Sequence, residues 1–389
     1  MHRSYELLAA GLTAVLLAGA PLPASAAGGP TWATGGHDAE NTGWNPGETG
    51  LVPATMDKIA PGWSIAATGT EVCARQSAPV LGGGRLFLTG REGVGGYDGR
   101  TGRRLWTFRY ADPMDTYTPL LALSGRTLLV ASSGCQSASD PDGMLTALDT
   151  ATGRVRWHLR TDSPDATLIV SRGVVVVGGE DAGGIATTAV NLATGAKLWQ
   201  RPRAMPANGV SAHGVLLLTT TQITTHDTNG AVAVDIATGR PRWRTGEQWS
   251  VLAATPDGTS FLVGDAAGAL LKVNARTGTT EWTRPGLAGA IAVDDTHVYV
   301  SRVDGEVHCL ELGTGRRDWH HTGFHGLLRP VVAGHVLYLV EQGRRLVTRN
   351  AATGRALPFV AAGKPIDHAV VAGGRIYLTD GSMLRTYTG

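Results

Sequence analysis

A nine-residue motif constrains this chain more than any other feature of its sequence. It consists of Asp or Asn, two residues, Thr-Gly, three residues and Trp, and its first copy runs from Asp98 to Trp106. The copies follow one another at a spacing of about 42 residues, which indicates a repeat array or a propeller. The Thr-Gly pairs of the seven copies are Thr101-Gly102, Thr152-Gly153, Thr194-Gly195, Thr238-Gly239, Thr277-Gly278, Thr314-Gly315 and Thr353-Gly354. The sixth copy begins with Glu311, and the seventh has Pro358 in place of the Trp.

Each copy predicts a β-hairpin. The glycine supplies a positive φ in the turn, and the Asp or Asn side chain can accept hydrogen bonds from the backbone just beyond it. The Trp buries a large ring and can donate its indole N–H to the next repeat. The motif is therefore interpreted as architecture rather than an active site. The expected docking tryptophans are Trp63, Trp106, Trp157, Trp199, Trp243, Trp282 and Trp319.

Four short strands per repeat are predicted from the pattern around each motif. In the sixth repeat the expected strands are 290–293, 297–301, 307–312 and 317–321, separated by turn residues such as Asp304-Gly305. Four antiparallel strands are the unit of a β-propeller blade.

The two ends of the chain complete the ring in this prediction. The segment 366–387 supplies three strands after the seventh motif, and 55–66 supplies one strand with Trp63 at its centre. Pairing them makes an eighth blade and leaves no long open strand edge. We expect an all-β, eight-bladed propeller closed in this way; seven blades with irregular ends is the alternative.

The first residues predict export. Residues 1–26 have a basic start, an apolar run and the small-residue sequence Ala24-Ser25-Ala26, as in a secretory signal peptide. No Cys follows the apolar run, so we expect a secreted protein and not a lipoprotein. Residues 27–50 are expected to form an irregular lead pinned by Trp32 and Trp44, and residues 51–389 the propeller.

The charge balance excludes some partners. With 34 Lys and Arg against 32 Asp and Glu, the formal net charge is +2. Nothing in this balance favours nucleic acid or an anionic membrane surface. No second hydrophobic segment suggests a membrane span, and we expect a monomer.

The repeat resembles that of pyrroloquinoline-quinone-type propellers over about residues 30–389. This family includes quinone-dependent alcohol dehydrogenases, the propeller lipoprotein of outer-membrane assembly, and exported or kinase-linked sensor propellers. The resemblance implies the fold, whereas function differs among members. In the enzymes, the quinone lies at the channel mouth over a Trp floor, with Ca²⁺ and a disulfide between adjacent cysteines.

This sequence lacks those site features. It has three cysteines, none adjacent to another, and short repeats that leave little chain to cover a cofactor. We predict no cofactor, with the quinone and Ca²⁺ as the alternative. We also predict no metal, because His320 and His321 are neighbours in a strand and point to opposite faces.

The cysteines predict one disulfide. Cys73 precedes the first blade and Cys135 lies in a lengthened hairpin of the second, so both are expected on the same rim of adjacent blades. Cys309 falls within a strand and is expected to be a buried free thiol.

A polar set just ahead of the inner strands forms the candidate binding face. It comprises Arg75, Gln76, Asp115, Tyr117, Asp165, Asn208, Gln248, Trp249, His325, Asp367 and His368. Mixed polar and aromatic groups around a channel suit a ligand or peptide, although a solvated rim is also polar. Three functions stay open: a non-enzymatic binding or scaffold propeller for a protein or cell-envelope ligand, which we favour; a quinone-dependent dehydrogenase; and a small-molecule or sugar sensor.

Overall fold

The computed structural model describes residues 31–66, 73–135, 143–161, 166–181, 184–221, 228–324, 326 and 328–389. The predicted signal peptide, Asp165 and His325 lie outside these residues. Two short 3₁₀ turns, η1 (Pro53–Thr55) and η2 (Pro113–Asp115), are the helical elements of the described part. Neither is long or apolar enough to cross a membrane.

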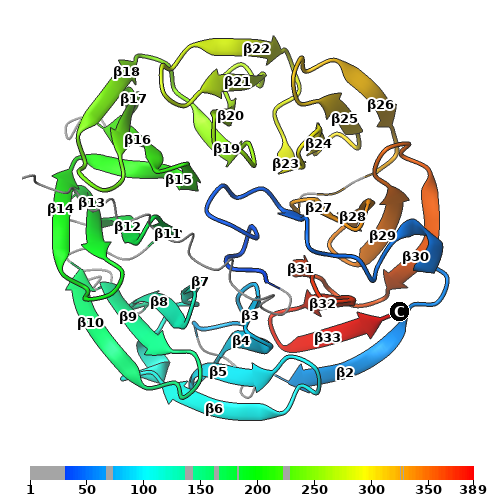
Figure 1. Cartoon of the computed structure of the whole chain (residues 1–389), viewed down its shortest axis with the longest axis horizontal. Coiled ribbons are helices and arrows are strands. Elements are labelled where there is room, and N and C mark those ends of the chain that lie inside the picture. Colours follow the sequence, from blue (N-terminus) through cyan, green and yellow to red (C-terminus); the bar gives the residue numbers. More distant parts are fainter. Residues whose placement is uncertain are drawn as a thin grey trace, which may run out of the picture.

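Eight antiparallel sheets stand around a central axis, as Figure 1 shows, and the predicted eight-bladed propeller is confirmed. Blades 1 to 4 are, from the axis outward, β3 (Val80–Gly82), β4 (Arg85–Gly90), β5 (Gly93–Asp98), β6 (Arg104–Arg109); β7 (Leu120–Ser124), β8 (Thr127–Ser133), β9 (Gly143–Asp149), β10 (Val155–Thr161); β11 (Thr167–Ser171), β12 (Val174–Asp181), β13 (Gly184–Asn191), β14 (Lys197–Pro202); and β15 (Ala204–Ala212), β16 (Val215–Thr221), β17 (Thr228–Asp235), β18 (Pro241–Thr245).

Blades 5 to 8 follow the same order. They are β19 (Ser250–Ala254), β20 (Ser260–Gly264), β21 (Leu270–Asn274), β22 (Thr280–Arg284); β23 (Ala290–Val293), β24 (His297–Ser301), β25 (Val307–Glu311), β26 (Arg317–His321); β27 (Val331–Ala333), β28 (Val336–Glu341), β29 (Arg345–Asn350), β30 (Ala356–Ala362); and β31 (His368–Val371), β32 (Arg375–Thr379), β33 (Met383–Thr388), β2 (Ala60–Ala66).

Blade 8 joins the two ends of the chain. Its outermost strand, β2, pairs antiparallel with β33, with Ala60 opposite Thr388 and Ala66 opposite Met383. The predicted closure is therefore confirmed. The remaining strand, β1 (Trp44–Asn45), pairs parallel with β27. It is a short strand within the lead that the sequence predicted to be irregular.

Burial explains the sequence of each strand. Middle strands such as β4 are buried on both sheet faces, because neighbouring blades cover them, and they consist of consecutive apolar residues. Outer strands such as β6 alternate between exposed and half-buried residues, and the motif Trp takes an inward position. The core thus lies between blades, in clusters that each combine residues of adjacent sheets.

The Thr-Gly turn and the Trp of the preceding blade lock neighbouring blades together. In blades 1 and 2, Trp106 donates its indole N–H to the Thr150 carbonyl oxygen at 3.0 Å, and its ring lies against Gly153. All seven docking tryptophans donate an indole N–H to a backbone carbonyl of the next blade and place the ring against the glycine of its Thr-Gly turn. The acceptors, in the order of the tryptophans, are Arg100, Thr150, Leu192, Ile236, Ala275, Leu312 and Ala351.

The absence of Trp from the seventh motif has a structural reason. Blade 7 faces blade 8, whose third and fourth strands belong to opposite ends of the chain and have no Thr-Gly turn between them. A Trp at Pro358 would have no such turn to dock on. Phe359 is buried there instead, with its ring edge-on to Tyr387 at 5.5 Å between centroids.

The interlock predicts a stability difference between two glycines. Gly153 has φ 69° and a Cβ there would lie 2.5 Å from the Trp106 ring, whereas Gly173 has φ 76° and open space around it. Both Gly→Ala changes strain the backbone equally, but only Gly153→Ala displaces a ring. We expect Gly153→Ala to lower the free energy of unfolding by about 2 kcal/mol more than Gly173→Ala, measured by urea unfolding. Equal costs would contradict the interlock.

Candidate functional site

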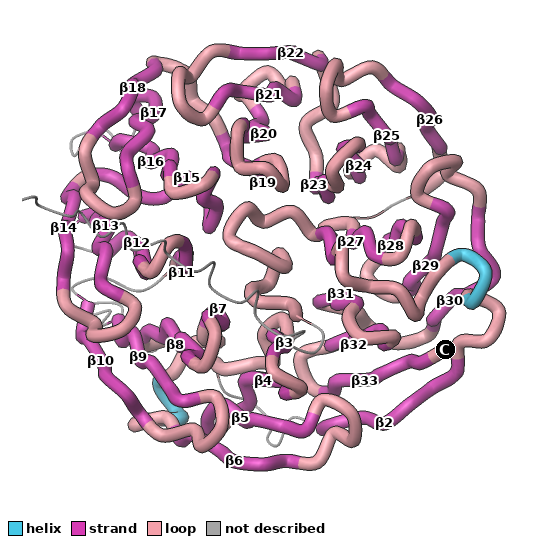
Figure 2. The backbone as a smooth tube through the Cα atoms, in the orientation of Figure 1, coloured by secondary structure: helices cyan, strands magenta, loops and turns pink. Residues whose placement is uncertain are grey.

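The two ends of the central channel differ, and we name them by the inner strands. The entry face is the end where the inner strands begin, and the turn face is the end where they finish and where the Thr-Gly turns lie. The lead (residues 31–50) crosses the middle of the ring in Figure 1, and Figure 2 shows that most of it is loop. It lies toward the turn face, because its partners are near the ends of inner strands.

Backbone carbonyls of the lead accept hydrogen bonds from one inner strand after another. The amides that donate are otherwise free on the axial side of each sheet, and the lead satisfies them. These bonds run from Leu123 to Ala33 (2.7 Å), Ser211 to Ala39 (2.7 Å), Ala254 to Glu40 (2.7 Å), Val293 to Thr42 (2.8 Å) and Val332 to Gly43 (2.9 Å). Trp32 pairs with Leu81, and the Asn45 amide donates to the Val371 carbonyl. The lead is therefore bonded to seven of the eight blades.

A half-buried arginine fixes the middle of the lead. Arg329, just ahead of β27, donates to the Asn41 carbonyl at 2.7 Å, to the Asn41 side-chain oxygen, and to the Leu252 carbonyl at 3.2 Å. Burial lowers the pKa of Arg329 to about 10, and the nearby Asp38 carboxylate opposes this. The guanidinium is thus charged at neutral pH and joins the lead to blades 5 and 7.

Replacing Arg329 should loosen this junction. Arg329→Met leaves the two Asn41 oxygens without their arginine donor, whereas the Leu252 carbonyl keeps the Asn41 side-chain amide as a donor at 3.0 Å, and we expect a loss of about 3 kcal/mol in the free energy of unfolding. Amides of Ala254 and Val293 should also exchange with solvent faster. Arg244→Met, at an exposed position of β18, is the matched control and should change stability by less than about 0.5 kcal/mol. Equal effects of the two changes in urea unfolding would refute the role given to Arg329.

Above the lead, toward the entry face, lies a cavity of about 530 Å³. The lead forms its floor with Thr34, Gly35, Gly36 and Asn41. Its wall is formed by residues just ahead of or within the inner strands of blades 1 to 4 and blade 8. The wall residues are Ser77, Ala78, Thr118, Pro119, Leu120, Leu121, Ala166, Thr167, Leu168, Asn208, Gly209 and His368. A mixed apolar and hydroxyl lining of this size is typical of a binding pocket.

His368 is the titratable group among the described residues of the cavity wall. Burial lowers its pKa, and the neighbouring Asp367 carboxylate opposes the shift. The imidazole is therefore neutral at physiological pH and can both donate and accept a hydrogen bond. The hydroxyl groups of Thr34, Ser77, Thr118 and Thr167 and the side-chain amides of Asn41 and Asn208 supply the other polar groups of the described lining.

With this geometry established, comparisons with known proteins identify the family. The model of a PQQ-like repeat family, described as outer membrane protein assembly factor BamB, matches residues 90–246 and 228–358. The chain belongs to this BamB-type family. The outer membrane protein assembly factor BamB of Bordetella pertussis is 26% identical over 344 residues, which cover 78% of this chain and 84% of the relative.

Solved structures agree on the fold of this BamB-type chain. BamB from Moraxella catarrhalis has a TM-score of 0.61 at 18% identity and covers 85% of this chain and 98% of its own. Quinohemoprotein alcohol dehydrogenase from Comamonas testosteroni has a TM-score of 0.66 at 14% identity, covering 92% and 80%. A europium-containing methanol dehydrogenase has 0.68 at 12%, covering 92% and 98%. At these identities the likeness concerns the fold alone.

Several predicted face residues of the BamB-type chain do lie at the entry face. Asn208 and His368 line the cavity, and Asn208 also bridges to the Val251 carbonyl of blade 5 at 2.5 Å. Asp367 lies beside His368 at a smaller cavity of about 200 Å³. Tyr117 is 56% exposed, and Arg75 is also exposed. These residues surround the cavity opening rather than form one compact cluster.

Two predicted face residues point elsewhere. Trp249 is buried between blades 4 and 5 and meets Trp243 edge-on at 6.3 Å, so it belongs to the core and offers no open ring. Gln76 is 3% exposed, and its side-chain amide has no hydrogen-bond partner within the described ranges. Gln248 is exposed beside Trp249.

A disulfide joins Cys73 and Cys135 at the same rim, with 6.2 Å between the Cα atoms. Asp115 is half-buried and accepts a hydrogen bond from the Cys135 amide at 2.8 Å, so it supports the bridge. Thr118 donates to the Cys73 carbonyl at 3.3 Å. The disulfide therefore links blades 1 and 2 where the exposed Met114 and Tyr117 project.

Sequence reasoning missed Arg329. The rule that selected the face, residues just ahead of an inner strand, would have found it, because Arg329-Pro330 precedes β27 directly. The sequence pattern predicts an inner strand of blade 7 that begins near His325, whereas β27 begins at Val331, so Arg329 falls outside the predicted face.

Proposed function

We propose that this protein is an exported, non-enzymatic binding propeller that holds a segment of a partner protein at its entry face. The observation that carries the proposal is the lead, which crosses the channel and turns its entry end into a cavity with a floor. The BamB-type relatives support it, since their name describes factors in outer membrane protein assembly. The disulfide supports export, because such bridges persist in oxidising compartments.

The entry face suits a peptide segment with apolar side chains. Leucine and proline side chains in the wall accept an apolar group, and the Thr118 and Asn208 side chains supply polar contacts beside it. Tyr117 and Met114, which are 56% and 50% exposed, extend this surface over the rim together with Arg75. Tyr, Met and Arg are the residue types enriched in protein interfaces.

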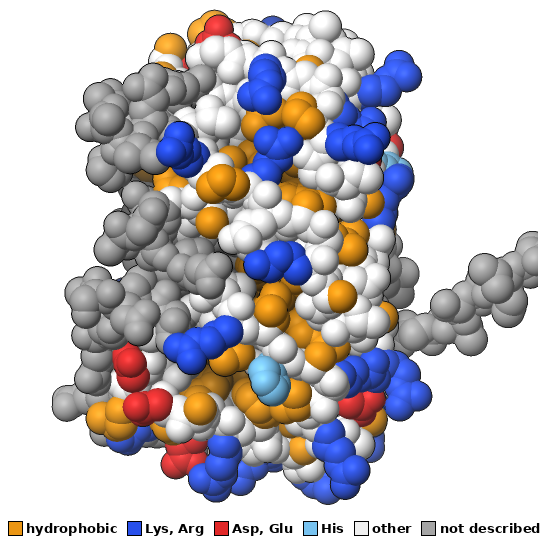
Figure 3. All heavy atoms as spheres, turned by 90° about the vertical axis from the view of Figure 1, so that its left-hand side faces the viewer, with side chains coloured by type: hydrophobic (Ala, Val, Ile, Leu, Met, Phe, Trp, Pro, Cys, Tyr) orange, Lys and Arg blue, Asp and Glu red, His pale blue; other side chains and the backbone are white. Residues whose placement is uncertain are grey.

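The outer wall of the ring offers a different surface. Figure 3 shows Lys and Arg side chains spread over one side of it with hydrophobic side chains between them. Leu198 is one of its exposed apolar residues, at 44%. Because Leu198 lies in β14, the outermost strand of blade 3, and is not among the residues that line the entry-face cavity, this part of the wall serves as the reference surface.

Photo-crosslinking from the entry face tests the proposal. A photoreactive phenylalanine analogue at Tyr117 should capture a discrete protein in the producing cells, since an exposed aromatic at a binding rim contacts the partner. The same analogue at Leu198 of β14 is the control and should not capture that protein. The adduct is identified by mass spectrometry. No adduct from Tyr117, or the same protein captured from Leu198, would overturn the proposal.

Quinone-dependent oxidation is the alternative suggested by the dehydrogenase neighbours, but the residues at the entry face do not fit the quinone. Cys73 and Cys135 are 62 residues apart, so their bridge differs from one between adjacent cysteines. Trp249 is buried in the core and cannot form a floor. Arg75 is an exposed cation that lies with the Asp367 carboxylate beside Gly381, whereas a quinone with several carboxylates needs more positive charge.

We therefore expect no retention of the quinone. Purified protein incubated with pyrroloquinoline quinone and Ca²⁺ should emerge from gel filtration without quinone absorbance, and should not reduce a dye when alcohols or sugars are added. Stoichiometric absorbance that co-elutes with the protein would contradict this expectation and favour the dehydrogenase alternative.

A further inference from the structure

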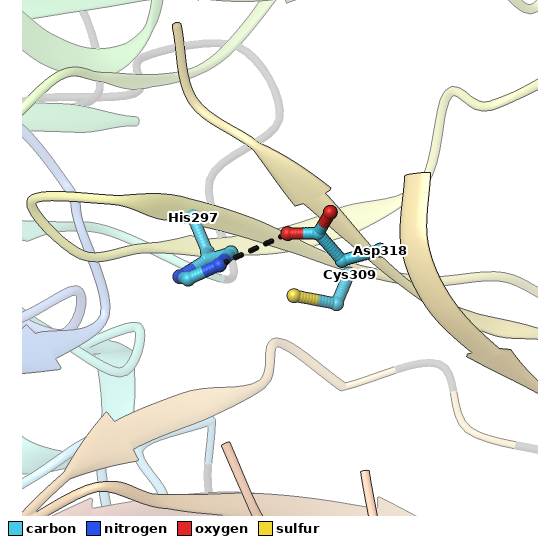
Figure 4. A group of neighbouring side chains, drawn as sticks. All are labelled: His297, Cys309 and Asp318. Atoms are coloured by element: carbon cyan, nitrogen blue, oxygen red, sulfur yellow. Dashed lines mark hydrogen bonds and ion pairs between the residues drawn. The ribbon is translucent and has the colours of Figure 1, made fainter. Parts of the chain in front are cut away.

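Three metal-ligand side chains meet in blade 6, away from the entry face. Figure 4 shows His297 of β24, Cys309 of β25 and Asp318 of β26 pointing toward one another. One ligand atom from each lies within 4.8 Å of the others. The site lies within blade 6 at the turn face. A groove of about 490 Å³ borders His297 and Asp318 there.

Strand register explains why these residues meet. Cys309 pairs with Tyr299, which is two residues from His297 and therefore on the same sheet face. On the other side, the register shifts between Cys309 and Leu310, so that Trp319 pairs with Cys309 and Arg317 with Leu310. Asp318 is the extra residue at this bulge, and bulges re-aim side chains. The bulge thus turns Asp318 toward the other two.

The hydrogen bonds of His297 place a lone pair on its Nε2 atom, opposite the Asp318 carboxylate, so that a proton or a cation is required between the two. Thr296 donates its hydroxyl proton to Asp294 at 2.9 Å, so the same hydroxyl can only accept from His297 Nδ1, at 2.8 Å. With the proton on Nδ1, a neutral imidazole presents a lone pair at Nε2. That atom lies 3.2 Å from Asp318 Oδ2, and two lone pairs repel unless a proton or a metal ion lies between them.

The surroundings hold the other two ligands in place. Arg316 binds Asp318 Oδ1 at 2.8 Å, which leaves Oδ2 directed at His297. Cys309 is fully buried beside Tyr299 and Trp319. Burial raises the pKa of its thiol, and the Asp318 and Asp294 carboxylates raise it further. A metal takes a cysteine ligand as the thiolate.

We propose that His297 Nε2, Cys309 Sγ and Asp318 Oδ2 form a binding site for a divalent transition-metal ion of the zinc class. Imidazole, thiolate and carboxylate are the three donor types that zinc takes in proteins. A tetrahedral ion separates its ligand atoms by roughly 3.5 Å, so these donors need to converge by about 1.3 Å at most. Three protein ligands leave the fourth position for water or for a group that enters the groove.

The His297 arrangement matches the way metal-binding histidines are oriented. Its Nδ1 proton is held by Thr296, which is held in turn by Asp294, and outer hydrogen bonds of this kind fix the imidazole tautomer. Asp294 also accepts from the Tyr299 hydroxyl at 2.9 Å. A bound ion would connect β24, β25 and β26 from within one blade.

Cobalt binding tests the site, because Co²⁺ replaces Zn²⁺ and is visible. Mature protein freed of metal by a chelator should bind one equivalent of Co²⁺ and show a thiolate-to-cobalt charge-transfer band in the near ultraviolet, and Zn²⁺ should remove that band. Cys309→Ser should abolish it. His297→Gln and Asp318→Asn should weaken cobalt binding by about ten-fold or more.

The control is His320→Gln in the same strand, because His320 stacks on His308 at 5.8 Å on the other face. It should bind cobalt as the parent protein does. If Cys309→Ser does not fold, the variants of the half-exposed His297 and the exposed Asp318 decide the matter. No charge-transfer band, or equal affinity in parent and His297→Gln, would overturn the proposal and leave an imidazolium–carboxylate pair at this place.

Discussion

A chain that begins at residue 67 should lose its cooperative unfolding transition, whereas a chain that begins at residue 51 should keep one. The first lacks β2 and the second retains it. Without β2, blade 8 is left with three strands, and β33 presents an unpaired edge next to blade 1. The expected loss is the whole stability of the fold, typically about 5–15 kcal/mol.

Contacts of β2 on both sides explain the size of this effect. Trp63 donates its indole N–H to the Arg100 carbonyl in blade 1 at 2.8 Å, and its ring lies against Gly102. Within blade 8, the Thr386 hydroxyl donates to the Trp63 carbonyl at 2.6 Å, and the Arg375 guanidinium lies 5.7 Å from the centroid of the Trp63 ring. This one residue therefore spans the seam of the ring.

Urea unfolding followed by both tryptophan fluorescence and far-ultraviolet circular dichroism provides the measurement. The two signals should change together for the chain from residue 51 and not for the chain from residue 67. A synthetic peptide of residues 51–66 added in excess should restore the transition. If the two chains unfolded with the same midpoint, β2 would not close the ring.

Removing the disulfide should have the next largest effect. Cys73→Ser with Cys135→Ser should lower the free energy of unfolding by about 4 kcal/mol, because the bridge closes a loop of roughly 60 residues in the unfolded chain. The link spans all of blade 1 and the first two strands of blade 2. Hydrogen bonds of Asp115 and Thr118 to the backbone of the two positions should remain in the variant.

A reductant separates this effect from other consequences of the substitutions. It should lower the unfolding midpoint of the parent protein to that of the double variant and should leave the double variant unchanged. Cys309→Ser is the control and should respond to reductant as the parent does, since Cys309 is a free buried thiol. Three titratable thiols in the denatured, unreduced protein would contradict the bridge.

Most of the ring could be predicted because its information is local. Each Thr-Gly turn needs a glycine with positive φ, each Trp has a fixed distance from that turn, and the end strands each lack a partner. The blade 6 strands accordingly begin and end within a residue of their predicted limits. The seventh motif could be interpreted only with the ring in hand, since Pro358 depends on the seam beside it.

The site was less predictable because it depends on contacts between distant residues. Arg329 and Asn41 are 288 residues apart, and no periodic pattern links them. The lead lacks a repeat of its own, so its path across the channel follows from the inner-strand amides that it satisfies. Asp318 reaches His297 and Cys309 through a bulge, and a one-residue register shift is not visible in the motif.

The affinity of the protein captured from Tyr117 for variants of the entry face tests the central claim most directly. Ala166→Trp fills the cavity at an exposed position of its wall, and Leu198→Ala changes the outer wall. The variants compared should have unfolding midpoints equal to that of the parent. Binding measured by calorimetry should then be at least about ten-fold weaker for Ala166→Trp and unchanged for Leu198→Ala. Unchanged affinity in Ala166→Trp, or loss of binding in Leu198→Ala, would contradict a binding site in the cavity.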